Sequence, residues 1–263
     1  MAFTCNVCGR STRAARDGLD REDPSCEHCG SSVRYRAIVH QLSVGLFGES
    51  LALPDFPQRP ELRGVGFSDW PGYAEPLAAR LGYRNTHLDA EPTLDLTAVP
   101  ERLAGTLDFV LCSEVLEHVE PPVERAFAGL ARLLRPGGLL VVTVPYSFDD
   151  DTVEHFPSLH EHALVDFHGR PILVNRALDG RWEVFDELAF HGGIGETLEL
   201  RLFSLAALLR QLEGAGFVAV AAHDEETPER GIVWPKPWSH PVTARRAAAP
   251  GASPGPARAT VQP

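Results

Sequence analysis

The stretch that decides the fold is LDFVLCSEVLEHVEPPVERAFAGLARLLRPGGLLVVTVP, residues 107–145. It opens with one apolar run (107–113) and closes with another (139–145), both of the length of buried strands. Between them, apolar side chains recur every three or four positions from Val123 to Leu134, which is the spacing of an amphipathic helix, and an RPGG sequence ends that helix. The stretch therefore predicts two parallel strands joined by a helix.

The same alternation continues on both sides of this unit. Apolar runs that predict strands precede it at 61–67 and 83–89 and follow it at 217–223, with helical patterns between them. Strands joined by helices indicate the α/β class, with a doubly wound sheet in a main domain over 33–240. Ligands of such sheets lie beyond the carboxyl ends of the strands, so the 107–113 strand should open onto a ligand site.

Four cysteines near the start of the chain form two Cys-x-x-Cys pairs. Two such pairs can place four thiolates at the corners of a tetrahedron, which is the structural site that Zn²⁺ prefers, and so short a segment holds no core without metal. The sequence therefore predicts a small zinc ribbon over residues 1–32; two disulfides, or unrelated thiols, are the alternative. The predicted zinc ligands are Cys5, Cys8, Cys26 and Cys29.

Composition bounds the remaining classes. The chain has 263 residues, 44% of them hydrophobic, which is enough for a buried core. Its formal net charge of −12, with Lys236 as its one lysine, argues against a nucleic-acid partner. The sequence contains neither a membrane-spanning apolar run nor a signal peptide, so we expect no membrane partner and a cytoplasmic location. Residues 241–263, rich in Ala, Pro, Gly and Arg, predict a disordered tail.

The stretch 107–145 resembles the central segment of class I S-adenosylmethionine-dependent methyltransferases, in which a strand ending in EHV is followed by a helix, an LRPGG turn and the next strand. The order of elements from 61 to 145 is also similar, and some small-molecule methyltransferases carry an N-terminal Cys-x-x-Cys knuckle. The resemblance implies a Rossmann-like methyltransferase sheet with S-adenosylmethionine as cofactor. It also implies a small-molecule acceptor beneath a covering insertion at about 146–203. The acidic composition of the chain and the histidines of that insertion favour a neutral or cationic acceptor and O-methylation, with a sugar or natural-product hydroxyl as the expected target.

The resemblance implies cofactor contacts at the strand ends. The glycine-rich turn under the methionine part of the cofactor is GVGFSDW, where Ser68 replaces the family's third glycine, so Ser68 and Asp69 are candidates for the ammonium contact. Asp89 is the expected partner of the ribose hydroxyls, with Glu91 as the alternative. The implied cofactor-binding residues are Gly64, Gly66, Ser68, Asp69, Asp89, Asp95, Leu96 and Ser113, of which Asp95 and Leu96 would contact the adenine.

Histidines are the candidate catalytic bases. Imidazole titrates near neutrality, so it can take the proton of an acceptor hydroxyl as the methyl group arrives. The candidates are His118, His155 and His191.

A helix beginning after Ser113 would place Glu114, Glu117 and His118 on one face. In one interpretation Glu117 and His118 anchor the turn by hydrogen bonds, and Glu114 is a solvated acid in the first turn of the helix. In the other, the three residues bind Mg²⁺, Mn²⁺ or Zn²⁺, which holds the acceptor's oxygens. Their E-x-x-E-H spacing is similar to that of quinone-pathway O-methyltransferases, in which such residues are thought to hold a metal.

Two other functions compete with a methyltransferase. A non-catalytic zinc-ribbon interaction protein with a degenerate methyltransferase domain would account for the altered glycine turn. A nicotinamide-dependent oxidoreductase is opposed by GVGFSD, which does not match G-x-G-x-x-G. Arg34 and Arg36, in a helix expected over 31–47, are expected to face solvent, with an anionic ligand as the alternative.

Overall fold

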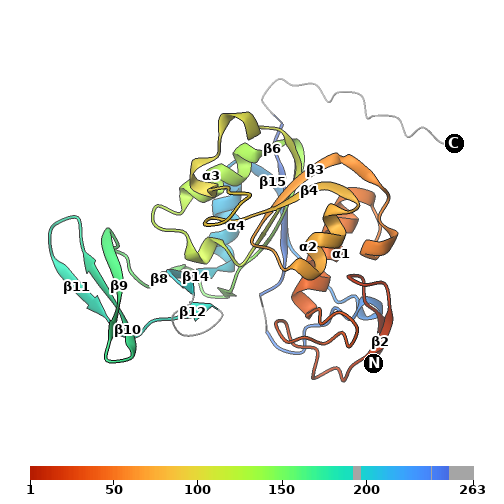
Figure 1. Ribbon diagram of the computed structural model, residues 1–263, viewed down its shortest axis with the longest axis horizontal. Helices are drawn as coiled ribbons and strands as arrows, with labels where there is room; N and C mark the ends of the chain where they lie inside the picture. The colour runs from red at the N-terminus through yellow and green to blue at the C-terminus, as the bar shows by residue number, and fades with distance from the viewer. Residues whose placement is uncertain (192–196, 238, 249–263) are drawn as a thin grey trace.

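The computed structural model describes residues 1–191, 197–237 and 239–248 (Figure 1). Its centre is a six-stranded sheet made of β3 (Arg59–Phe67), β4 (Leu81–Thr86), β5 (Leu107–Ser113), β6 (Leu134–Thr143), β15 (Phe217–Ala222) and β16 (Val242–Arg246). The strand order is β15-β16-β6-β5-β3-β4. The strands β6, β5, β3 and β4 are parallel, whereas β16 runs antiparallel to both of its neighbours.

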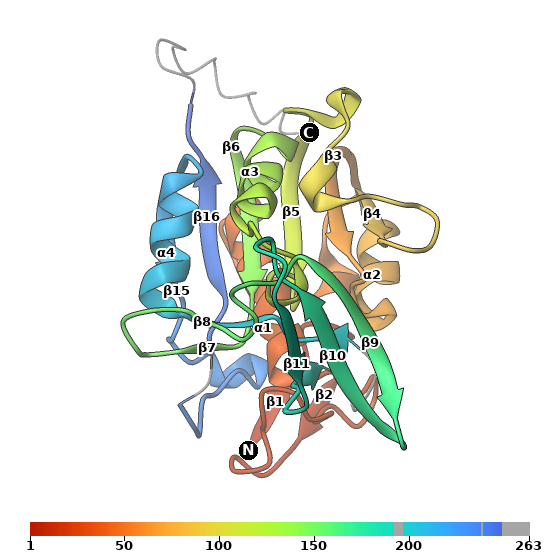
Figure 2. The same cartoon turned by 90° about the vertical axis from the view of Figure 1, so that its left-hand side faces the viewer.

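Helices cover both faces of this sheet (Figures 1 and 2). The helices α1 (Val33–Phe47) and α2 (Pro71–Ala78) pack on one face, and α3 (Glu124–Leu133) and α4 (Leu205–Gly214) pack on the other. Each face has its own apolar core, which is why the strands between them read as continuous apolar runs. The prediction of a doubly wound Rossmann-like α/β sheet is confirmed.

The predicted disordered tail is wrong for its first part. Val242–Arg246 form β16, which lies inside the sheet between β15 and β6. Val242 and Ala244 are buried against the neighbouring strands, so two small apolar residues at alternate positions are enough to place this Arg- and Ala-rich segment in the sheet. Residues 249–263 lie outside the described residues.

The segment between β6 and α4 consists of short strands. These are β7 (Tyr146–Ser147), β8 (Val153–Glu154), β9 (Glu161–Phe167), β10 (Arg170–Arg176), β11 (Trp182–Phe185), β12 (Phe190–His191), β13 (Thr197–Leu198) and β14 (Arg201–Ser204). The strands β9, β10 and β11 form an antiparallel sheet that projects from the body (Figure 1). This segment also brings His191 of β12 back to the carboxyl ends of the central strands.

The N-terminal cysteine segment, with β1 (Ala2–Thr4) and β2 (Ser11–Arg13), packs against the start of α1. Ser32 caps α1, because its hydroxyl accepts a hydrogen bond from the Tyr35 backbone N–H. Single turns of 3₁₀ helix complete the fold at Leu53–Asp55, Leu96–Ala98, Glu101–Leu103, Leu116–His118 and Pro228–Arg230. Among the described residues, no helix is long and apolar enough to cross a membrane.

Candidate active site

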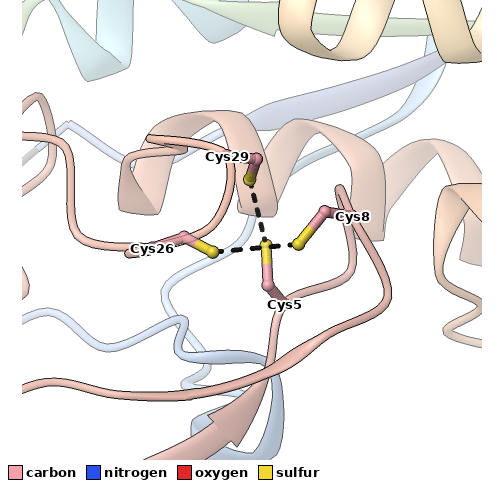
Figure 3. Close-up of side chains that lie close together, drawn as sticks. All are labelled: Cys5, Cys8, Cys26 and Cys29. Atoms are coloured by element: carbon pink, nitrogen blue, oxygen red, sulfur yellow. Dashed lines mark hydrogen bonds between the residues drawn. The ribbon is translucent and has the colours of Figure 1, made fainter.

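The four N-terminal cysteines converge on one point (Figure 3). The Sγ atoms of Cys5 and Cys29 lie 3.8 Å apart, as do those of Cys8 and Cys26. A separation of about 3.8 Å is the edge of a tetrahedron whose corners lie about 2.3 Å from its centre, which is the Zn–S distance. The cluster therefore has the geometry of a four-thiolate metal site and is compatible with a zinc ribbon.

The electrostatics of Cys5 suit the same role. Hydrogen bonds to its Sγ from the Cys29 thiol and, at 3.2 Å, from the Ser31 hydroxyl lower the pKa of Cys5 to about 4, against the effect of burial. These hydrogen bonds favour the thiolate form of Cys5, which is the form that binds metal.

A cleft opens at the carboxyl ends of β3, β4 and β5. It consists of two adjoining cavities of about 440 and 520 Å³, which share the walls formed by Phe67, Ser68, Leu88, Val115 and His118. The predicted site residues that line the cleft are Ser68, Asp69, Asp89, Asp95, Leu96, Ser113, Glu114, His118 and His191. Most of the predicted cofactor residues are thus brought together, as the rule for parallel sheets requires.

Asp69 lines the larger cavity. Its side chain is buried, and burial raises its pKa to about 6, although the Tyr83 hydroxyl donates to Oδ2 at 2.5 Å. Asn85 holds the Asp69 backbone by two hydrogen bonds of 2.8 and 2.9 Å. The other carboxylate oxygen, Oδ1, makes no hydrogen bond of normal geometry with the described residues, although the buried Tyr73 hydroxyl lies close enough to the carboxylate to lower its pKa. A buried carboxylate oxygen that lacks a normal hydrogen bond beside a cavity fits a cationic ligand group such as the ammonium of S-adenosylmethionine.

The two predicted glycines do not border the cleft. A Cβ on Gly66 would lie 1.9 Å from Asp69 Oδ2 and 2.2 Å from the Tyr83 hydroxyl, so Gly66 makes room for the Asp69 carboxylate. A Cβ on Gly64 would meet the ring of Phe109 at 2.3 Å, so Gly64 serves the core. We expected these glycines to let the cofactor approach the backbone. The structure shows another use, because the side chains of Phe109, Asp69 and Tyr83 occupy the space where a Cβ would lie.

The predicted ribose and adenine residues lie along the cleft. Asp89 is exposed and lines the larger cavity, whereas the alternative, Glu91, does not. Asp95 and Leu96 line the smaller cavity together. Asp95 also caps the short helix that starts there, because its Oδ1 accepts hydrogen bonds from the Thr97 N–H and hydroxyl.

Glu114 is corrected as a candidate metal ligand. Its φ of +53° turns it away from a helical path, and its carboxylate accepts hydrogen bonds from Arg21 at 2.8 and 3.3 Å. Burial alone would raise the pKa of Glu114, but the charges of Arg21 and Arg34 outweigh burial and hold the pKa at about 2. The predicted grouping of Glu114, Glu117 and His118 on one helical face is therefore wrong.

A different trio forms instead. Ligand atoms of Glu117, His118 and His191 lie within 4.8 Å of one another. Glu117 is fully buried, and its carboxylate oxygens make no hydrogen bond with the described residues, although His118 Nε2 lies 3.6 Å from Oε1. Burial raises the pKa of Glu117 well above the usual value.

The candidate bases separate into two groups. The ring of His118 lies 5.7 Å from that of His191, and both rings line the cleft. His118 Nδ1 donates to the Leu198 carbonyl at 2.8 Å, and burial lowers the pKa of His118, so its neutral form keeps Nε2 as the basic atom. His155 instead hydrogen-bonds the Glu199 carbonyl through Nδ1 and lines neither cavity of the cleft.

A further pocket of about 400 Å³ adjoins the cleft, with which it shares Glu114 and His191. Its other walls come from distant parts of the chain, namely Arg21, Glu22, Pro145, Tyr146, Leu202, Pro237 and Ser239. A second ligand in this pocket would lie next to a ligand in the cleft.

Sequence reasoning missed the contribution of the N-terminal segment to the cleft. Arg34 and Arg36 are both buried, so the expectation that they face solvent is wrong. Arg34 lines the larger cavity together with Tyr35 and Trp70, whose rings stack 4.6 Å apart. One feature of the sequence could have indicated this role, namely the adjacent Arg34 and Tyr35 at the start of the helix that follows the cysteine pairs.

Comparison with known proteins identifies the family. A family described as "Methyltransferase domain" matches residues 57–222, which is more than half of the chain. The chain belongs to this methyltransferase family. The matched range contains the whole cleft apart from the residues contributed by α1, so the prediction of a methyltransferase is confirmed. Among the curated proteins, none matches the chain.

Several solved methyltransferase structures are similar to the chain. The 1,6-didemethyltoxoflavin-N1-methyltransferase of Burkholderia thailandensis is 16% identical, with 82% of this chain and 78% of that one covered, at a TM-score of 0.44. The amino pentose methyltransferase CalS10 of Micromonospora echinaspora is 18% identical (83% and 93% covered, TM-score 0.43). The sugar N-methyltransferase KedS8 of Streptoalloteichus is 14% identical (91% and 96% covered, TM-score 0.45). Similarity at this level does not transfer a substrate to this chain.

Proposed function

We propose that the protein is an S-adenosylmethionine-dependent methyltransferase that methylates a small molecule, with the hydroxyl of a sugar or natural product as the acceptor. The observation that carries the proposal is the buried carboxylate of Asp69, whose Oδ1 makes no normal hydrogen bond with the described residues, beside a cleft at the carboxyl ends of parallel strands. Asp69 would hold the ammonium, Asp89 the ribose hydroxyls, and Asp95 with Leu96 the adenine. Ser68 and Ser113 line the same cleft.

The acceptor is assigned to the pocket beside Glu114 and His191. When bound, the cofactor supplies an electrophilic methyl group. The chain's own residues orient the acceptor next to it and take up the proton that its hydroxyl loses. His118 and His191 are the proposed bases, because both lie at the cleft and the Nε2 of neutral His118 can accept a proton. His155 is not retained in this role.

The cysteine cluster is assigned a structural zinc ion. Four thiolates leave no open coordination position, so this zinc would stabilise the ribbon over residues 1–32 and take no part in methyl transfer. The methyltransferase domain over 33–240 then follows directly, since α1 begins at Val33. The described residues of the segment 146–203 are proposed to cover the acceptor.

Calorimetry with S-adenosylhomocysteine and NAD tests this function. Binding of S-adenosylhomocysteine and none of NAD is the expected result. Binding of NAD alone would indicate an oxidoreductase, and binding of neither would indicate a degenerate domain that acts as an interaction module. Transfer of a labelled methyl group to a panel of sugars and phenols then identifies the acceptor.

Asp89→Ala is expected to weaken S-adenosylhomocysteine binding by about 1.5–3 kcal/mol, because hydrogen bonds from the ribose hydroxyls to a carboxylate are lost. Asp89 is exposed, so the fold should survive the change. Calorimetry measures the effect, and Glu91→Ala is the matched control because Glu91 does not line the cleft. Unaltered affinity in Asp89→Ala together with weakened binding in Glu91→Ala would transfer the ribose contact to Glu91.

Methyl transfer is expected to survive mild EDTA treatment that leaves the four-thiolate zinc in place. Mg²⁺ and Mn²⁺ prefer several charged oxygen ligands, whereas the remaining trio offers one carboxyl group, and burial raises the pKa of that group and so disfavours its charged form. Activity is measured with any acceptor found in the panel. Loss of activity that added Mn²⁺ restores would assign a catalytic cation to Glu117, His118 and His191.

A further inference from the structure

The ribbon and the start of α1 form one wall of the site. Arg34 and Tyr35 line the cofactor cleft, and Arg21 and Glu22 line the adjoining pocket. The ribbon is therefore packed against the place where methyl transfer is proposed, although it lies outside the 57–222 range that matches the methyltransferase family.

Arg21 makes the closest connection. Its side chain is 6% exposed, and its Nη2 lies 2.8 Å from Glu114 Oε1, while its Nε donates to the Ser239 carbonyl at 2.9 Å. One ribbon side chain thus holds both the end of β5 and a segment near the C-terminus. Glu114 needs such a partner, because its φ of +53° is unfavourable for a glutamate and its carboxylate is buried.

Arg34 continues the connection toward the cofactor. Its Nη1 donates to the Ser113 hydroxyl at 2.7 Å, and its Nε donates to the carboxylate of Glu22. The Arg34 backbone N–H donates to the Arg21 carbonyl at 3.0 Å. Arg21, Glu22 and Arg34 are therefore one hydrogen-bonded unit that contacts two consecutive residues at the end of β5.

The cysteine cluster fixes the position of this unit. The Ser31 hydroxyl lies 3.2 Å from Cys5 Sγ, and the Ser31 carbonyl accepts a hydrogen bond from the Cys26 N–H. The next residue, Ser32, caps α1, and Arg34 lies in the first turn of that helix. Disorder of the cluster would therefore release both the segment that carries Arg21 and the first turn of α1.

We propose that Arg21 is a positioning residue through which metal binding at the four cysteines supports cofactor binding in the cleft. The metal orders the ribbon, the ribbon places Arg21, and Arg21 holds Glu114 and, through its backbone, Arg34 against Ser113. This inference rests on the proposed function, because it takes the cleft to be the cofactor site.

The test measures the affinity of the zinc-loaded protein for S-adenosylhomocysteine by calorimetry. Arg21→Gln is expected to lose about tenfold or more in affinity while keeping its zinc, because Arg21 is no metal ligand. Arg21→Lys, which retains the charge, should recover part of the loss. Arg16→Gln is the matched control, since Arg16 is a ribbon arginine that pairs with Glu226 and lines neither the cleft nor the adjoining pocket.

Removing the zinc tests whether the metal and Arg21 act on cofactor affinity through the same connection or independently. The wild-type protein should lose affinity on zinc removal, whereas Arg21→Gln, already weakened, should lose little more, because the two changes interrupt one connection. Full affinity in zinc-loaded Arg21→Gln with an unchanged circular dichroism spectrum would overturn the proposal, and so would independent, additive losses. Failure of the zinc-loaded wild type to bind S-adenosylhomocysteine would instead refute the proposed function.

Discussion

Replacing Cys26 and Cys29 together with serine is expected to remove one zinc ion per chain and to unfold the ribbon. The sulfur separations of 3.8 Å match a zinc tetrahedron, and serine hydroxyls do not replace thiolates as zinc ligands. Structural zinc in isolated small domains contributes on the order of 10 kcal/mol or more, so no rearrangement of so few apolar side chains can compensate. Metal analysis of the purified protein measures the loss.

Cys112→Ala is the control for this change. Cys112 is the fifth cysteine, buried in β5 outside the cluster, and the variant should keep its full zinc content. The central sheet should remain in both proteins, because its two apolar cores consist mostly of side chains from strands and helices beyond residue 32. Unchanged zinc content in the double serine variant would exclude the cluster as the metal site.

The sequence predicted those features of the fold and the site that depend on residues close together in the chain. Apolar periodicity located the strands and helices of the sheet, and the Cys-x-x-Cys spacing anticipated a cluster that the structure brings together. Asp69, Asp89 and Asp95 were found through the resemblance to class I methyltransferases, and all three line the cleft, with Asp69 and Asp89 shortly after the ends of β3 and β4.

The sequence did not predict the contacts between residues that are far apart in the chain. Arg21 and Glu114 are 93 positions apart, and no periodicity relates them. The same holds for His118 and His191, whose proximity depends on the path of the strands between β6 and α4. Strand β16 was missed for another reason, because its Arg and Ala content outweighed the weak alternation of Val242 and Ala244.

Asp69→Asn is expected to reduce the affinity for S-adenosylhomocysteine by about 3 kcal/mol, on the order of 100-fold. The amide keeps the shape of the side chain but removes the negative charge that would meet the ligand's ammonium group. The hydrogen bond from Tyr83 can persist, so the variant should fold. Asp186→Asn, at an exposed position that lines neither cavity of the cleft, is the control.

The pH dependence of binding distinguishes this role from a structural one. Burial raises the pKa of Asp69 to about 6, and an ammonium ligand requires the carboxylate, so wild-type affinity should fall as pH drops below about 6, by roughly tenfold per unit at the limit. The free protein should show the opposite trend. An aspartate whose pKa is raised on folding takes up its proton more readily in the folded state, so its contribution to stability improves as pH falls from about 6 toward about 4. Asp69→Asn should lack both trends. Calorimetry at several pH values measures the affinity, and thermal melting at the same pH values measures the stability. If the variant keeps the wild-type pH dependence of binding, Asp69 is not part of the cofactor site.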